Sequence, residues 1–205
     1  MPKITRRYKM PHMRRLDKKT DYAKRLKMVK SGIPRATVRK SLANITVQLI
    51  KFEESGDKVL ASASSKQLGA YGWKAPSGNL PAAYLTGLLA GLNAKKANVT
   101  EAVLDAGLKK STKGSRIYAA LKGLLDAGIK IAHDPAILPD EKRISGAHIA
   151  AYATAGGSGF SKYGVTPAEL PKHFAEVKAK MVSGAVKPAT ERTSSAKPSQ
   201  PAKGK

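Results

Sequence analysis

The chain of 205 residues has no cysteine, few aromatic side chains and few acidic ones. Without cysteine it can form no disulfide, no thiolate metal site and no cysteine nucleophile, which is typical of a reducing compartment. Only 5% of the residues are aromatic, so aliphatic side chains must build the core. No apolar run approaches the roughly 20 residues that span a bilayer, and the basic N-terminus lacks the apolar segment of a secretory signal. We therefore expect a soluble intracellular protein with no membrane partner.

Basic residues outnumber acidic ones by 38 to 14, which gives a formal net charge of +24. Fifteen basic and only two acidic residues lie within 1–40, whereas sixteen basic and eleven acidic residues are spread over 41–177. This excess favours a polyanionic partner. We expect three parts: a basic N-terminal arm with a short helix over 1–34, a core with a C-terminal helix over 35–182, and a basic tail over 183–205. The tail is rich in Ala, Lys, Pro and Ser and has too few apolar side chains to fold.

The first half of the chain predicts a short helix followed by a hairpin of strands. Thr20 is the expected N-cap of a basic amphipathic helix over 21–31, and Gly32 supplies the left-handed stop. Alternating apolar residues predict one long strand over 36–52, and turn residues lead from it into a second strand at 59–61.

The second half alternates helices and strands. A helix is predicted over 79–93, and its small residues recur every four positions, which we interpret as close packing on a sheet; they are Ala83, Gly87 and Gly91. Candidate strands at 102–104 and 129–132 flank a helix over 115–128, and such a βαβ unit is expected to be parallel.

A final helix follows Thr166, Pro167 and Glu169, which have the pattern of a capping box. Together these elements predict an α/β fold in which helices pack on a mixed β-sheet.

Patterns for catalysis or metal binding are weak. The Gly-rich stretch 156–159 follows no convincing strand, so a phosphate-binding loop is not supported, and the four histidines lack metal-ligand spacing. Asp105 and Asp134 with their neighbours could serve a metal-dependent nuclease, but Asp126 is explained locally by a pair with Lys122. We expect no cofactor, no metal and no small-molecule substrate, and the nuclease is kept as the alternative hypothesis.

Basic residues interleaved with aromatic rings favour RNA as the polyanion. Guanidinium and ammonium groups bind phosphates, and rings stack on unpaired bases. No helix-turn-helix, zinc finger or heptad pattern would place a helix in a DNA groove, so a chromatin-like architectural protein is only a third hypothesis. The candidate RNA contacts of this kind are Arg6, Arg7, Tyr8, Lys9, Arg14, Arg15, Tyr22, Tyr71, Trp73 and Lys74.

Seven blocks, in order between about residues 6 and 182, resemble the archaeal and eukaryotic branch of the L-eighteen family of large-subunit ribosomal proteins. They are Arg14-Arg15, 19–26 (KTDYAKRL), 31–35 (SGIPR), 38–41 (VRKS), 60–64 (LASAS), 82–90 (AAYLTGLLA) and 138–149 (LPDEKRISGAHI). The chain departs from the family pattern at Lys18-Lys19, where a glycine would precede Lys-Thr-Asp.

The resemblance implies a cytoplasmic ribosomal constituent of the central protuberance that binds 5S rRNA and helps anchor it to the large-subunit rRNA, beside neighbouring ribosomal proteins. It also implies a ribonuclease H-like topology without the active site, and hence no enzymatic activity. The RNA contacts that it implies are Lys18, Lys19, Tyr22, Arg25, Arg35, Arg39, Lys40 and Ser41, together with Tyr71, Trp73 and Lys74 in a loop.

Overall fold

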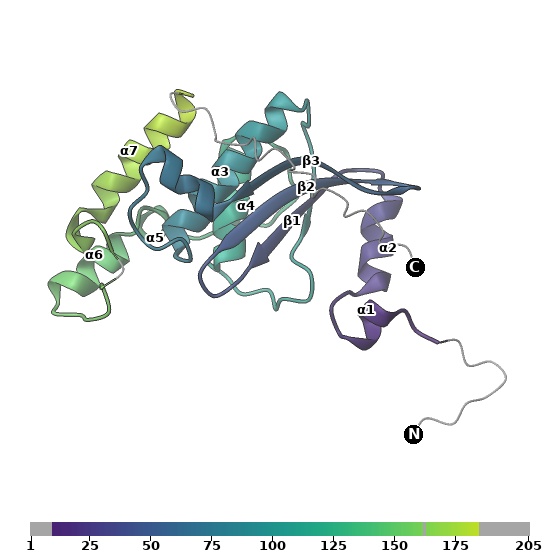
Figure 1. Ribbon diagram of the computed structural model, residues 1–205, viewed down its shortest axis with the longest axis horizontal. Helices are drawn as coiled ribbons and strands as arrows, with labels where there is room; N and C mark the ends of the chain where they lie inside the picture. The colour runs from purple at the N-terminus through teal and green to yellow at the C-terminus, as the bar shows by residue number, and fades with distance from the viewer. Residues whose placement is uncertain (1–9, 162, 185–205) are drawn as a thin grey trace, which may run out of the picture.

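The computed structural model describes residues 10–161 and 163–184 (Figure 1). Its centre is a four-stranded sheet in the order β3-β2-β1-β4. The strands are β1 (Arg35–Lys40), β2 (Ile45–Glu53), β3 (Gly56–Ser64) and β4 (Val103–Asp105). The first three pair antiparallel, and β4 lies parallel to β1. The expected mixed α/β class is confirmed.

Helices surround this sheet. The α-helices are α1 (Met13–Leu16), α2 (Tyr22–Lys30), α3 (Leu80–Lys96), α4 (Arg116–Asp126), α5 (Glu141–Ser145), α6 (Ala147–Thr154) and α7 (Leu170–Val182). Three 3-10 helices connect them, namely η1 (Ser65–Tyr71), η2 (Pro135–Ile137) and η3 (Pro167–Glu169). Within the described ranges, no helix is long and apolar enough to cross a membrane.

The strand expected over 36–52 is two strands joined by a tight turn, so that expectation is wrong. The Ser41 backbone N–H donates to the carbonyl oxygen of Asn44 at 2.8 Å, and the Asn44 N–H donates to Ser41 Oγ at 2.9 Å. These bonds close a hairpin between β1 and β2, because Ser and Asn side chains stabilise turns by bonding to nearby backbone.

The predicted βαβ unit is present in shortened form. β4 leads into α4, and the chain then returns to the sheet through a single parallel bridge between Glu101 and Lys130. The Ala102 N–H donates to the carbonyl oxygen of Lys130 at 3.0 Å, which fixes this return segment beside the start of β4.

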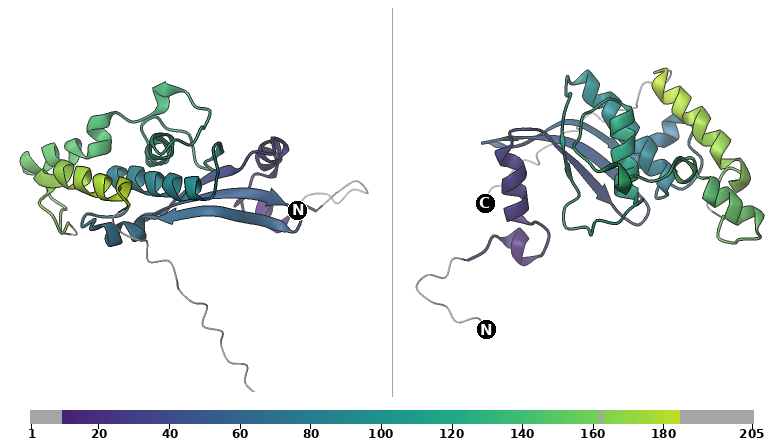
Figure 2. Two further views of the ribbon diagram at one scale, coloured as in Figure 1. Left: turned by 90° about the horizontal axis from the view of Figure 1, so that it is seen from above. Right: turned by 180° about the vertical axis from the view of Figure 1, so that it is seen from behind.

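The core lies between the sheet and α3 and α4, and Figure 2 (left) shows these helices on one side of the strands. Residues two apart on a strand point to the same face, and the residues of β1 and β2 that face the helices are fully buried. They are Ala36, Val38, Ile45, Val47 and Leu49. The expected pair of Lys122 with Asp126 is confirmed at 3.0 Å, and Tyr84 also donates to Asp126 at 2.7 Å.

Gly87 and Gly91 of α3 face α4, so for these two residues the expected packing partner, the sheet, is wrong. A Cβ atom on Gly87 would overlap the backbone of Ala120, and one on Gly91 would overlap the side chain of Ala127. A Cβ on Gly123 of α4 would in turn overlap the carbonyl oxygen of Tyr84. The two helices therefore touch backbone to backbone, which only glycine permits at these positions.

The ends of the outer helices differ in detail from the prediction. Asp21, not Thr20, caps α2, since its side chain accepts from the Lys24 N–H at 3.1 Å. Gly32 ends that segment with φ of +70°, as expected. The capping box at Thr166 does not form: Thr166 bonds instead to the Glu169 carboxylate, a 3-10 turn occupies Pro167–Glu169, and α7 begins at Leu170.

Candidate nucleic-acid interface

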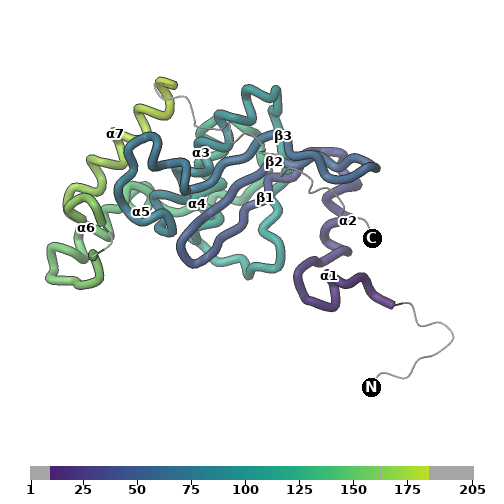
Figure 3. The backbone as a smooth tube through the Cα atoms, in the orientation of Figure 1, coloured from purple at the N-terminus to yellow at the C-terminus, as the bar shows by residue number. Residues whose placement is uncertain are grey.

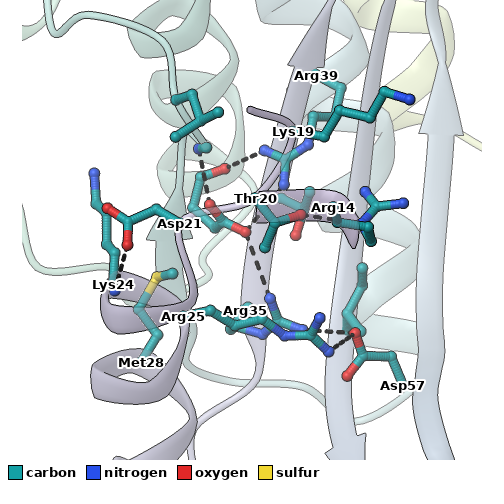
Figure 4. A pocket seen from close by; sticks show the side chains of 15 residues that line it. Arg14, Lys19, Thr20, Asp21, Lys24, Arg25, Met28, Arg35, Arg39 and Asp57 are labelled. Atoms are coloured by element: carbon teal, nitrogen blue, oxygen red, sulfur yellow. Dashed lines mark hydrogen bonds and ion pairs between the residues drawn. The ribbon is translucent and has the colours of Figure 1, made fainter. Parts of the chain in front are cut away.

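A chain of alternating arginines and aspartates lies on the face of the sheet opposite α3 and α4 (Figure 4). The alternation of β1 places Arg35, Thr37 and Arg39 on this face. Arg35 Nη2 donates to Asp57 Oδ2 at 2.9 Å, and its Nη1 lies 3.5 Å from Asp105 Oδ2. Arg39 Nη2 donates to the same Asp105 oxygen at 3.1 Å.

The helix α2 is attached to this cluster through its own arginine. Arg25 Nη2 donates to Asp57 Oδ2 at 2.8 Å, so one carboxylate oxygen joins α2, β1 and β3. Arg14 of α1 donates from Nε to Thr20 Oγ1 at 3.0 Å, which folds α1 back toward the start of α2. These polar and ionic contacts therefore help to place the arm segment over the sheet.

A cavity of about 180 Å³ lies between this arm segment and the strands. Three carboxylates line it, those of Asp21, Asp57 and Asp105, but so do six cationic side chains, which are Arg14, Lys19, Lys24, Arg25, Arg35 and Arg39. Its charge is therefore positive, and it fits an anion.

Two buried polar atoms at this cavity lack a hydrogen-bond partner within the described ranges, Arg35 Nε and Thr37 Oγ1. Both residues are about 95% buried. Buried donors are normally satisfied, because leaving one unpaired costs about 1–3 kcal/mol. Both atoms are closed off from solvent, so a ligand reaches them only when the lining side chains move.

A shallower depression adjoins the cavity at the turn between α1 and α2. Arg15, Lys18, Tyr22 and Leu108 are among its lining residues. Lys18 has a left-handed backbone with φ of 51°, a conformation that glycine adopts at no steric cost. The resemblance led us to expect a glycine before Lys19, and the left-handed backbone of Lys18 agrees with that expectation.

Most of the basic residues singled out from the sequence gather at these two hollows. Arg14, Lys19, Arg25, Arg35 and Arg39 line the cavity, while Arg15, Lys18 and Tyr22 line the depression. Lys40 and the exposed Ser41 lie where β1 ends. The expected contacts Arg6, Arg7, Tyr8 and Lys9 lie outside the described residues, as does the tail beyond Gly184.

Tyr71 and Trp73 do not fit the stacking role expected of them. Their residues are only 4% and 6% exposed, and the Trp73 ring stacks on His173 of α7 at 5.3 Å between centroids. The Lys74 N–H donates to His173 Nε2 at 3.2 Å, so this loop is packed against α7. The rings belong to the core, and of the three residues only Lys74 is exposed.

Sequence reasoning also missed cationic residues. Lys24 lines the cavity, and the loop between β4 and α4 carries Lys109, Lys110 and Lys113 in an exposed run beside it. The signal was present as the letters KKSTK, but an average over the nearly neutral middle of the chain concealed it.

The nuclease hypothesis has no geometry behind it. Asp105 is surrounded by arginines, and Asp134 caps η2 by accepting from the Ala136 N–H at 2.9 Å. Among the residues that the structure describes, no three His, Asp or Glu side chains are grouped so that they could hold a metal ion.

Comparison with known proteins matches this chain to one family. The family described as "Ribosomal large subunit proteins 60S L5, and 50S L18" matches residues 6–98 and 93–134. A "Large ribosomal subunit protein uL18" of Korarchaeum cryptofilum is 59% identical over 147 residues, which cover 72% of this chain and 75% of the relative. Proteins of the same description from Methanococcus maripaludis and Haloarcula marismortui are 48% and 47% identical, covering 86% and 87% of this chain and 97% and 95% of the relatives.

These matches make the chain a structural, non-enzymatic protein of the large ribosomal subunit. It belongs to the family of ribosomal large subunit proteins 60S L5 and 50S L18, in agreement with the resemblance of its motif blocks.

Proposed function

We propose that this protein binds 5S rRNA and helps anchor it to the large-subunit rRNA in the central protuberance of the cytoplasmic ribosome, beside other large-subunit proteins. One observation carries the proposal: basic side chains of α1, α2 and β1 converge on a positively charged cavity. Phosphate oxygens supply both the negative charge and the acceptors that such a cavity requires.

The basic residues divide into two roles under this proposal. Arg35 is buried and Arg25 is one-third exposed, and both are bound to Asp57, so through this shared carboxylate Arg25 links α2 to β1 and β3. Arg39 is half exposed and leaves donors free for a phosphate. The residues proposed to contact RNA directly are the exposed or half-exposed ones, namely Arg14, Arg15, Lys18, Lys19, Tyr22, Arg39, Lys40, Ser41 and Lys74.

We propose that Arg6, Arg7, Tyr8 and Lys9 extend the same contact, because they continue the basic run of the arm. The expected division into an arm over 1–34 and a core over 35–182 is part of this proposal. The role of the tail over 183–205 stays open.

The proposed scaffold is ribonuclease H-like. Three antiparallel strands followed by a parallel β4 beside β1, and then by the parallel bridge from Glu101 to Lys130, support that topology.

The test is competition binding in moderate salt. 5S rRNA is expected to outcompete an unrelated structured RNA of equal length and a DNA duplex of equal charge. Equal affinity for the two RNAs would contradict the proposal, and a preference for the duplex would favour an architectural DNA-binding protein instead.

A variant pair localises the binding. Arg14→Gln/Arg15→Gln removes two proposed phosphate contacts, and roughly 20-fold weaker binding is expected near 0.15 M salt. The control Lys95→Gln/Lys96→Gln removes the same charge from exposed positions at the end of α3 that do not line the cavity, and is expected to bind almost as the unmodified protein does.

A further inference from the structure

The loop between β4 and α4, residues 106–115, is a cationic surface that contains none of the residues proposed above to contact RNA. It contains three lysines and no acidic residue. All residues from Leu108 to Lys113 are exposed. Among the described residues, none of the three lysines forms an ion pair. Their charge is therefore available to a partner.

This loop lies directly beside the arm segment, and Figure 3 shows the two along one border of the molecule. Leu108 lines both the cavity and the depression at the α1–α2 turn. Gly107 has φ of +62°, and a Cβ there would lie 3.1 Å from Arg39 Nη1. The loop thus leaves the sheet in contact with the arginine cluster, which is Arg25, Arg35 and Arg39. It extends the positive surface of that cluster.

The loop is held in shape by the domain itself. At its start the Gly107 N–H donates to Asp105 Oδ1 at 2.8 Å, so Asp105 positions both Arg39 and the loop. Farther along, the hydroxyl groups of Ser111 and Tyr118 are hydrogen-bonded. The Gly114 N–H donates to the carbonyl oxygen of Ile137 at 3.0 Å. A loop fixed at both ends and in the middle loses little conformational entropy when it binds.

We propose that this loop is the second wall of the RNA-binding surface, in which Lys109, Lys110 and Lys113 bind phosphates of a strand whose neighbouring phosphate is held by the arginine cluster. The proposal rests on the proposed RNA-binding function and deepens it. Lysine binds phosphate as a point charge without reading bases, so the loop contributes affinity and placement rather than sequence preference.

The first test is the triple variant Lys109→Gln/Lys110→Gln/Lys113→Gln, measured for 5S rRNA affinity across a salt series. Three lost contacts predict roughly 50-fold weaker binding near 0.15 M salt and a log–log salt slope smaller by about 2–3. The control Lys95→Gln/Lys96→Gln/Lys130→Gln changes the net charge equally, at exposed positions near the ends of α3 and α4. Thermal unfolding followed by circular dichroism checks that both variants fold.

The outcomes separate the two proposals. An equal loss in the control would reduce the effect to net charge and overturn the inference. Unchanged binding of the loop variant, while Arg14→Gln/Arg15→Gln is weakened, would overturn the inference and leave the proposed function standing. If the unmodified protein does not prefer 5S rRNA, the proposed function fails, whereas the loop variant still reports whether the loop contacts RNA.

A second test uses the absence of cysteine. Thr112→Cys introduces a single thiol at the tip of the loop, to which an iron chelate that generates hydroxyl radicals can be attached. We expect cleavage of bound 5S rRNA close to the tip, and weak or no cleavage from Ala97→Cys at the exposed end of α3. Equal cleavage from both sites would show that the loop is no closer to the RNA than the end of α3, and it would refute the proposal that the loop contacts RNA.

Discussion

Arg25 of α2 donates to Asp57 of β3 at 2.8 Å, across 32 residues of sequence. Asp57 also accepts a hydrogen bond from Arg35. Arg25, which the sequence suggests as an RNA contact, is therefore part of the attachment of the arm to the domain. Under the proposed function, Arg25 would therefore act on RNA binding through the position of α2.

Asp57→Asn should test this attachment. The change removes the charge that offsets two arginines, one of them buried, and we expect a loss of about 1–3 kcal/mol in the free energy of unfolding. Urea denaturation measures it. Asp17→Asn is the control: Asp17 pairs with Lys19 at 3.1 Å on the surface, where such a pair contributes less than about 1 kcal/mol. Equal losses in the two variants would show that Asp57 has no special role.

The contact between α3 and α4 is tested by Gly87→Ala. Alanine has the higher helix propensity, yet its methyl group would overlap the backbone of Ala120, and we expect a net destabilisation of about 1–3 kcal/mol. Gly69→Ala is the matched change, because a Cβ there meets no atom within 4 Å. The midpoint of thermal unfolding should fall for Gly87→Ala and stay nearly constant for Gly69→Ala; a stabilised Gly87→Ala would contradict the backbone contact.

The left-handed Lys18 can be tested with two substitutions that remove the same charge. Lys18→Gly suits the observed φ, whereas Lys18→Ala keeps the steric cost of about 1 kcal/mol. The turn is closed by the Lys19 and Thr20 N–H groups, which both donate to the carbonyl oxygen of Arg14. Hydrogen exchange of these two amides should be about five-fold slower in Lys18→Gly than in Lys18→Ala. Equal exchange would mean that the turn carries no strain.

His173 makes stability depend on pH. Burial lowers its pKa, and Lys74 and Lys180 act in the same direction, while Glu176 opposes them. The folded protein thus binds this proton less readily than the unfolded chain, whose histidines titrate near 6.5. The stability it contributes is complete above that pH and is lost as the pH falls through the window below it. Between pH 7 and pH 5 the unfolding free energy should fall more steeply in the unmodified protein than in His173→Gln; parallel curves would refute the assignment.

Local periodicity predicts α2, α3, α4 and α7 and the class of the fold, whereas the short helices α1, α5 and α6 were not predicted. The apolar stripe of α3 and the buried face of α7, with Phe174, Val177 and Met181, are encoded within single segments. The hairpin between β1 and β2 was missed because Leu42 and Ala43 prolong the apolar pattern through the turn, although Leu42 is 96% exposed. The end of β1 is set by its pairing with β2, and a pattern within one segment does not show that pairing.

The candidate site was predictable in composition and not in arrangement. The density of arginine and lysine in the arm predicts a polyanion-binding segment, but the ion pairs from Arg35 to Asp57 and Asp105 join residues 22 and 70 positions apart. Trp73 was misread for the same reason, since the ring that covers it belongs to His173, 100 residues later. Burial created by such distant neighbours leaves no local signal.

The helix α2 contributes no fully buried side chain, and the ion pair from Arg25 to Asp57 helps to hold it on the domain together with the partly buried Met28 and Val29. A high salt concentration weakens this ion pair, and it also weakens the proposed binding of a nucleic acid. At high salt the free protein would then differ from its low-salt form in the position of α2 as well as in its affinity for RNA. Part of any measured salt dependence of the affinity would come from α2 moving away from the sheet. The number of phosphates contacted can therefore be derived from the salt dependence only when the position of α2 in the free protein is measured over the same salt range.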